Sequence, residues 1–86
     1  MAMENKHRDT FLAGDFRWIA GERPEKTSLQ VKIRHGALIY DCEVKFLEND
    51  QAEITLDRPD RAGIAAGQFA VFYDDIRCLG SAVILK

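Results

Sequence analysis

The chain has 86 residues, 47% of them hydrophobic, which is enough for one small domain and too short for two. Twelve basic and fourteen acidic side chains give a net charge of −2, which excludes a polybasic nucleic-acid arm. No apolar run approaches the roughly 20 residues of a membrane-spanning helix, and residues 1–6 lack the apolar stretch of a signal peptide. These features predict a cytoplasmic protein with no membrane partner.

The first dozen residues are polar and show no clear period. We therefore expect residues 1–14 to be an interdomain lead-in, with residues 1–3 an added start, and residues 15–86 to form the domain. The aromatic and β-branched run at residues 16–20 predicts a short strand, which the glycine and proline within residues 21–24 end.

Three segments then alternate between apolar and polar side chains, the signature of half-buried strands. They cover residues 28–34, 38–47 and 52–57, and the intervening turns are short, so the three strands are predicted to form a meander. Residues 68–73 are almost continuously apolar, which is typical of a strand covered on both faces. Asp74 and Asp75 form a turn before the last strand, residues 76–85, in which Gly80 indicates a bulge or a sharp bend.

This pattern predicts an all-β fold of about six short strands with no substantial helix. Closure into a small antiparallel barrel would leave no long edge exposed, and an open two-layer sandwich is the alternative architecture. The inward side chains of such a barrel are expected to fill it, leaving no room for a buried small-molecule cavity.

Cysteine and histidine are scarce. Cys42 and Cys78 are too few for a disulfide scaffold, and with His7 and His35 they show no spacing typical of a zinc site. Cys42 alternates in phase with Tyr40, and Cys78 lies within a predicted strand, so both thiols are expected to pack in the core. No metal site and no catalytic residue is predicted.

Three segments carry a family resemblance. Residues 61–80 read RAGIAAGQFAVFYDDIRCLG, residues 15–22 read DFRWIAGE, and residues 31–34 read VKIR. In this order and spacing they resemble the closing part of the bacterial tRNA-specific 2-thiouridylases. The resemblance extends over most of residues 8–85.

The resemblance implies the C-terminal β-barrel domain of an ATP-dependent tRNA wobble-uridine sulfurtransferase. It implies that ATP and the catalytic cysteines belong to N-terminal and central domains outside this chain, so that this domain has no cofactor of its own. It also implies that the domain helps to bind and position tRNA as part of the parent enzyme. The glycines between residues 63 and 67 lie between predicted strands and lack the Ser, Thr or Lys of a phosphate-binding loop, so they predict no nucleotide site.

Four cations are candidates for contact with the tRNA backbone. They are Lys32 and Arg34 on the polar face of the predicted strand at residues 28–34, and Arg58 and Arg61, which flank the loop after the strand at residues 52–57. Gripping RNA phosphates takes several cations on one surface, whereas the same side chains could simply pair with carboxylates on the neighbouring strand. Trp18 is expected in the core or at a domain interface, with base stacking as the alternative.

Two functional readings stay open. In the first, the domain is a tRNA-binding module of a modification enzyme. In the second, it is a structural barrel that braces a partner domain without touching RNA. Since small barrels support many functions, the fold alone does not separate these readings.

Overall fold

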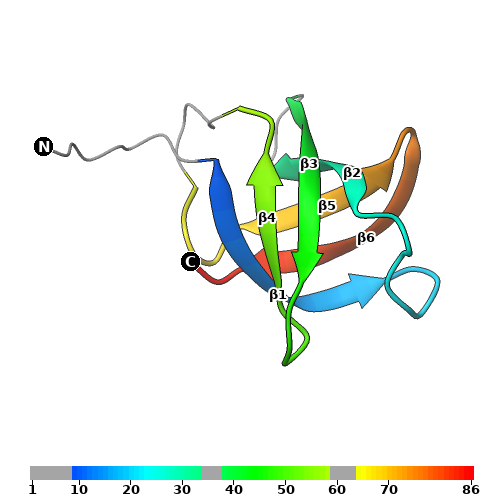
Figure 1. The fold of residues 1–86 in the computed structure, drawn as a ribbon, viewed down its shortest axis with the longest axis horizontal. Helices are drawn as coiled ribbons and strands as arrows, with labels where there is room; N and C mark the ends of the chain where they lie inside the picture. Colours follow the sequence, from blue (N-terminus) through cyan, green and yellow to red (C-terminus); the bar gives the residue numbers. More distant parts are fainter. Residues whose placement is uncertain (1–8, 34–37, 59–63) are drawn as a thin grey trace, which may run out of the picture.

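The computed structural model describes residues 9–33, 38–58 and 64–86. These residues form six strands and contain no helix. The strands are β1 (Thr10–Trp18), β2 (Ser28–Ile33), β3 (Ile39–Phe46), β4 (Ala52–Leu56), β5 (Phe69–Asp74) and β6 (Arg77–Ile84). All neighbours pair antiparallel, and the ring β1-β4-β3-β2-β5-β6 closes between β6 and β1 (Figure 1). The predicted closed barrel is confirmed, and the open sandwich is wrong.

The core follows from the alternation of apolar and polar side chains along each strand. Every second residue of β2, β3 and β4 points inward, and all of these except the half-buried Phe46 are buried, including Leu29, Val31, Tyr40, Val44 and Ile54. Burying one such side chain stabilises the fold by about 1.5–3 kcal/mol. A slip of one residue would turn a whole strand's apolar set outward, so this alternation sets the register of the barrel.

Strands β2, β3 and β4 form the predicted meander. The turn between β3 and β4 is closed by the Leu47 amide, which donates to the Gln51 carbonyl at 2.7 Å. Asn49 and Asp50 have φ angles of 64° and 59°. Asn and Asp tolerate this left-handed conformation better than other residues with a side chain, which explains the polar turn sequence.

Strand β1 closes the barrel and begins earlier than predicted. Residues 10–13 pair with β4, and Ala13, Gly14, Arg17 and Trp18 pair with β6. A bulge between Gly14 and Arg17, with Asp15 at φ 52°, bends the strand from one neighbour to the other. Before the bulge the odd-numbered residues, such as Ala13, point inward; after it the even-numbered residues Phe16 and Trp18 do. The aromatic and β-branched run predicted a strand at residues 16–20; its first three residues do belong to β1, but the strand begins at Thr10 and ends at Trp18, so the barrel includes residues 10–14.

A second bulge lies in β6, as the glycine predicted. Phe72 pairs with Gly80 and the next residue, Tyr73, pairs with Cys78, so Leu79 is the extra residue. A Cβ atom on Gly80 would collide with the carbonyl oxygen of Arg17 and lie 2.9 Å from the Cα atom of Trp18. The close approach of β1 therefore requires glycine at this position.

In the described part of the chain, strand β5 is covered on one face only. Ala70 and Phe72 are buried, whereas Phe69 points outward and is 62% exposed. The prediction of two covered faces is wrong for the described residues. The apolar residues of β5 therefore serve two purposes. Ala70 and Phe72 pack in the core, whereas Phe69 and Val71 form an apolar outer surface.

Candidate nucleic-acid interface

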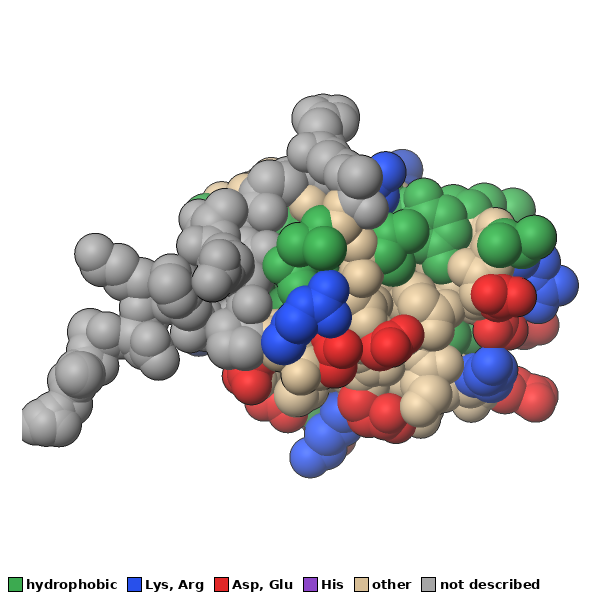
Figure 2. Space-filling model, turned by 90° about the horizontal axis from the view of Figure 1, so that it is seen from above, with side chains coloured by type: hydrophobic (Ala, Val, Ile, Leu, Met, Phe, Trp, Pro, Cys, Tyr) green, Lys and Arg blue, Asp and Glu red, His purple; other side chains and the backbone are tan. Residues whose placement is uncertain are grey.

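The barrel presents two outer faces of different chemistry. We call the outward side chains of β3 and β4, with Asp57 just after β4, the β3–β4 face; its charged members are Asp41, Glu43, Lys45, Glu53 and Asp57. We call the outward side chains around β5 and β6 the β5–β6 face; its members are Arg17, Lys32, Phe69, Val71, Ser81 and Val83. Figure 2 shows hydrophobic side chains gathered along the upper side of the view and most carboxylates along the lower side.

Lys32 is the first candidate cation, and it points outward from β2. Its cross-strand partners are Ile39 on β3 and Val71 on β5, neither of which is charged. Among the described residues, no carboxylate lies within ion-pair distance of Lys32. The cross-strand charge pair that the sequence allowed as an alternative is therefore not formed by this lysine in the described part of the chain.

Arg58, the second candidate, lies where β4 ends. Its guanidinium group is 4.7 Å from the centroid of the Tyr40 ring, in cation–π geometry, and donates to both carboxylate oxygens of Asp57 at 3.0 and 3.2 Å. Because the Tyr40 ring is buried inside the barrel, the Arg58 guanidinium above it covers one end of the barrel. We call the group formed by Tyr40, Asp57 and Arg58 the Tyr40 end. The guanidinium is thus partly neutralised and held in place.

The topology brings Lys32 and Arg58 to the same end of the barrel. Lys32 pairs with Ile39, and the next residue of β3, Tyr40, lies beneath Arg58. The other two candidate cations, Arg34 and Arg61, lie outside the described residues, as does His35. The structure therefore places two of the four candidates at one end of the barrel, and the other two stay predictions.

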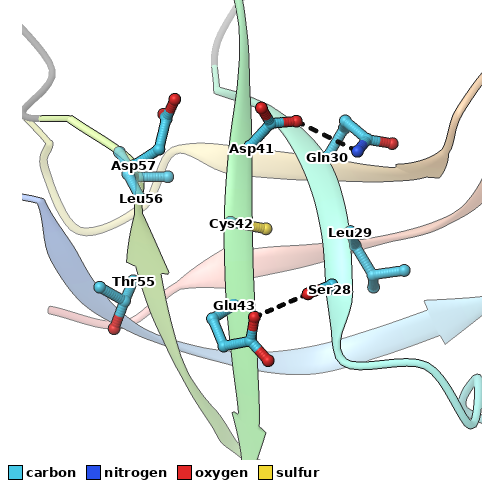
Figure 3. A pocket seen from close by; sticks show the side chains of 9 residues that line it. All are labelled: Ser28, Leu29, Gln30, Asp41, Cys42, Glu43, Thr55, Leu56 and Asp57. Carbon is cyan, nitrogen blue, oxygen red and sulfur yellow. Dashed lines mark hydrogen bonds between the residues drawn. The ribbon is translucent and has the colours of Figure 1, made fainter.

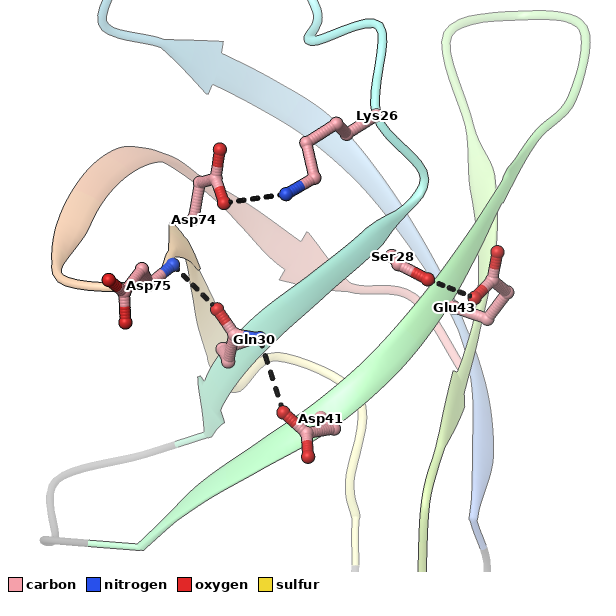
Figure 4. Close-up of polar contacts among 7 residues, drawn as sticks. All are labelled: Lys26, Ser28, Gln30, Asp41, Glu43, Asp74 and Asp75. Atoms are coloured by element: carbon pink, nitrogen blue, oxygen red, sulfur yellow. Dashed lines mark hydrogen bonds and ion pairs between the residues drawn. The ribbon is translucent and has the colours of Figure 1, made fainter.

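Two carboxylates on the β3–β4 face, those of Asp41 and Glu43, accept hydrogen bonds from neutral side chains. The hydroxyl groups of Thr27 and Ser28 donate to Glu43 at 2.9 and 2.8 Å. Gln30 donates to Asp41 at 3.2 Å and accepts from the Asp75 amide at 2.7 Å (Figure 4). Residues of β2, β3 and the end of β4 line an open groove of about 370 Å³ on this side (Figure 3). Its negative charge opposes contact with a phosphate backbone.

The opposite end of the barrel is closed by aromatic rings. The Phe16 and Trp18 rings stack with centroids 5.0 Å apart and planes 10° apart, and Phe46 and Phe72 lie within 6.2 Å of them. The guanidinium of Arg23 lies 4.6 Å from the centroid of the Phe46 ring. We call these five residues the Phe46 end. The half-buried Trp18 ring is already stacked on Phe16, which favours the packing role predicted for it over stacking on a base.

A groove of about 490 Å³ opens beside the Phe46 end. It lies between the β1–β2 connection and the start of β6 and is lined by Trp18, Ile19, Arg23, Arg77 and Cys78 among others. Ile19 is 73% exposed, and Ile76 at the tip of the β5–β6 hairpin is 91% exposed. These apolar side chains make the region a candidate contact surface for protein.

The two cysteines differ in environment. Cys42 is buried, and burial, followed by the negative charge of Glu43, raises the pKa of its thiol from 9.0 to about 12. Cys78 is exposed, so the prediction that it packs in the core is wrong. Strict alternation from Ala82 and Gly80 would have turned Cys78 inward, but the extra residue Leu79 reverses the phase and turns it outward.

Within residues 9–33, 38–58 and 64–86, no three His, Cys, Asp or Glu side chains are grouped as metal ligands would be. In the same part of the chain, no helix is long and apolar enough to cross a membrane. The acidic pair Asp74 and Asp75 lies where β5 ends: Asp75 has φ 61°, as a tight turn requires, and Asp74 pairs with Lys26 at 2.9 Å (Figure 4).

Sequence reasoning missed two residues of the β5–β6 face. Arg17 is an exposed cation whose nearest carboxylate is that of Asp15 at 3.8 Å, and Phe69 is an exposed aromatic residue. The sequence signal for Phe69 was its place in an apolar strand, which suggested burial. For Arg17, alternation with the two flanking aromatic residues already indicates an outward side chain, but its neighbour Ser81 on β6 follows only from the strand pairing.

Comparison with known proteins identifies relatives along nearly the whole chain. The family model of the aminomethyltransferase beta-barrel domain matches residues 8–84. A tRNA-specific 2-thiouridylase, MnmA, of Francisella philomiragia is 34% identical over 79 residues, and that of Francisella tularensis subsp. novicida is 35% identical over the same length. Each alignment covers 91% of this chain and 22% of the relative.

The chain therefore spans about a fifth of the length of these relatives. The matched region coincides with the closed barrel, from just before β1 to the end of β6. The resemblance to the closing part of the 2-thiouridylases is thereby confirmed, and the chain belongs to the aminomethyltransferase β-barrel domain family.

Proposed function

We propose that this chain is the non-catalytic C-terminal barrel of a tRNA wobble-uridine 2-thiolation enzyme and that it helps to bind and position tRNA. The observation that carries the proposal is the match over residues 8–84, with relatives named as tRNA-specific 2-thiouridylases. The parent enzyme would use ATP bound in another domain, and its N-terminal and central domains would be the partners of this barrel. Such an enzyme would act in the cytoplasm.

The charges of the described residues support a contact with RNA phosphates at the Tyr40 end. Lys32 has no carboxylate partner among the described residues, and Arg58 is held over Tyr40 at the same end of the barrel. A cation without a partner at a fixed position can bind a phosphate without first breaking an ion pair. Arg34 and Arg61 remain predicted members of this contact.

The environment of Cys42 supports a non-catalytic role for this barrel. Sulfur transfer through a persulfide needs a thiolate, and a thiol with a pKa raised to about 12 is protonated at neutral pH. Cys78 is exposed, and the described residues that line its groove include no histidine to take its proton. The reactive cysteines of the proposed reaction would therefore belong to other domains.

The alternative function is a structural barrel that braces a partner domain. The exposed Ile19 and Ile76 and the groove beside Trp18 favour it, because apolar side chains at the Phe46 end would gain most from contact with protein. The two functions use opposite ends of the barrel, so one experiment can separate them.

A titration of the labelled chain with an unmodified tRNA transcript, followed by amide NMR shifts, tests the proposal. We expect shifts near Lys32 and Arg58, and an affinity that falls about tenfold between roughly 50 and 200 mM salt if two to three phosphates are contacted. Lys32→Gln and Arg58→Gln should weaken binding. Lys45→Gln on the β3–β4 face, where Lys45 pairs across strands with Glu53, is the matched control and should not.

An absence of shifts at either salt concentration would overturn RNA binding by this chain and favour the bracing function. Shifts confined to residues 18–25 and 76–79 would mean contact at the Phe46 end. That result would contradict the proposed placement of the RNA at the Tyr40 end.

A further inference from the structure

Two cations on the β5–β6 face lie at the ends of one cross-strand row. Lys32 is opposite Val71, Val71 is opposite Ser81, and Ser81 is opposite Arg17. The row runs from β2 through β5 and β6 to β1. Three strand spacings of about 4.8 Å put its ends about 14 Å apart along the curved wall of the barrel. Both cations therefore lie on one continuous stretch of the outer surface, which β2, β5, β6 and the end of β1 form.

Phe69 lies beside this row. It is two residues from Val71 on the same face of β5, which makes it a diagonal neighbour of Lys32 at roughly 7–8 Å. Its ring is 62% exposed, whereas Phe72, at an inward position of the same strand, is fully buried. Phe69 also lies opposite Val83, so the ring, Val71 and Val83 form an apolar patch that Lys32 borders. An apolar patch edged by polar or charged side chains marks a contact site.

The charges of this face differ from those of the β3–β4 face. Among the described residues that point outward from β5, from β6 beyond its bulge and from the end of β2, none is acidic. Only Asp15 lies near Arg17, at 3.8 Å between two exposed side chains, and such a pair contributes little. The four carboxylates of the β3–β4 face would repel a phosphate backbone, so the β5–β6 face is the electrostatically compatible one.

We propose that the β5–β6 face binds a single-stranded segment of RNA, with Lys32 and Arg17 each contacting a phosphate and Phe69 stacking on an unpaired base. This inference rests on the proposed function and specifies it. Single-stranded RNA is recognised by aromatic residues on sheet surfaces together with cations that follow the backbone. A duplex keeps its bases stacked and would leave the Phe69 ring without a partner.

Fluorescence anisotropy with three labelled probes tests the inference: an unmodified tRNA transcript, an oligouridine of about 12 nucleotides, and an RNA duplex of the same length. Phe69→Leu keeps an apolar side chain and removes the aromatic face. We expect it to weaken binding of the tRNA and of the oligouridine about tenfold and to leave the salt dependence unchanged. The duplex should bind weakly to both proteins.

Arg17→Gln should behave differently. Removing one phosphate contact should weaken binding several-fold and lower the slope of log affinity against log salt by about 0.7. Ile76→Ala removes an exposed apolar side chain outside the face, and Lys45→Gln removes a cation from the β3–β4 face; neither should change the affinity. All four positions are exposed, and unchanged thermal midpoints would confirm that the variants fold.

The outcomes separate this inference from the proposed function. If the wild-type chain binds tRNA but Phe69→Leu and Arg17→Gln bind equally well, the inference is overturned and the proposed function stands. Equal affinity for the duplex and the oligouridine would also overturn it. If the wild-type chain binds no RNA, the proposed function fails, and the β5–β6 face would then be better explained as a protein contact.

Discussion

The two ends of the barrel are closed by the same device but differ in what lies around it. At each end a guanidinium group covers an aromatic ring, Arg58 over Tyr40 at 4.7 Å and Arg23 over Phe46 at 4.6 Å. At the Phe46 end the ring belongs to a cluster of four aromatic side chains. At the Tyr40 end the guanidinium is also held by Asp57, and Lys32 lies on β2 at the same end of the barrel.

Under the proposed function, the Phe46 end contributes mainly to stability and the Tyr40 end mainly to binding. Aromatic rings that pack on one another stabilise the fold through buried area and through favourable ring geometry. A guanidinium held between a ring and a carboxylate at the surface adds little stability, but it fixes a positive charge in position. We therefore expect substitutions at the Phe46 end to affect mainly unfolding, and substitutions at the Tyr40 end to affect mainly RNA affinity.

The largest expected effect is that of Trp18→Ala. The ring stacks on Phe16 and packs against Phe46 and Phe72, so its removal should lower the free energy of unfolding by about 3 kcal/mol. Urea denaturation followed by circular dichroism measures it. Ile19→Ala, at the next and 73% exposed position, should change stability by less than about 0.5 kcal/mol. Equal losses for the two variants would mean that the aromatic cluster is not what stabilises this end.

Gly80→Ala should come next, with a loss of about 2–3 kcal/mol. The added Cβ would meet backbone atoms of Arg17 and Trp18, which cannot move away without breaking the β1–β6 pairing that leads into the Phe46 end. Gly21→Ala is the matched control. Gly21 has φ 88° with no atom within 4 Å of an added Cβ, so only backbone strain of about 1 kcal/mol is expected. Denaturation of both variants tests whether the close approach or the backbone angle dominates.

Cys42 lies on β3 between Tyr40 and Phe46, the residues that mark the two ends. Ionisation of its buried thiol should lower the free energy of unfolding of the barrel. Because burial raises its pKa from 9.0 to about 12, the unfolded chain loses the thiol proton first as the pH rises. Stability is therefore full below about pH 9 and is lost from there up to about pH 12, by about 2 kcal/mol at roughly pH 10.5.

Denaturation midpoints between pH 7 and about pH 10.5 measure this loss. Cys42→Ala should be less stable at neutral pH but show a flatter alkaline decline, because the ionising thiol is absent. Parallel declines for the two proteins would show that other groups cause the alkaline loss.

Arg58→Gln and Arg23→Gln should have the smallest effects on stability. Together they also test most directly whether the two ends of the barrel differ in function. Each variant loses one exposed cation–π contact, so each should lose about 0.5–1 kcal/mol of unfolding free energy. Only Arg58→Gln should also weaken tRNA binding, by several-fold, in an anisotropy titration. If Arg23→Gln weakens tRNA binding as much, the two ends do not divide the roles as proposed.

Local alternation was sufficient to predict most strands, because a half-buried strand needs apolar side chains at every second position. Leu29, Val31, Tyr40, Val44 and Ile54 are all inward, as their sequence phase indicates. The alternation failed where an extra residue changed the phase. The bulge after Gly14 concealed the first half of β1, and the bulge at Leu79 turned Cys78 outward.

For the candidate site, the sequence supplied the residue types and the family, whereas the placement depended on pairing between distant strands. Lys32 was identified as a candidate from its own strand alone. That it lacks a carboxylate partner in the described structure, and that it shares a row with Arg17, follows from the neighbours β3, β5 and β6.

The sequence by itself determined the fold class, the inward face of most strands and the family of this protein, because these depend on periodicity and on short motifs. The tertiary structure alone decided the strand order around the closed barrel, the two guanidinium-covered ends and the contrast between the acidic and the apolar outer faces. The physical reason is that an outward side chain acquires its neighbours across strands, and those neighbours are set by register and bulges rather than by proximity along the chain.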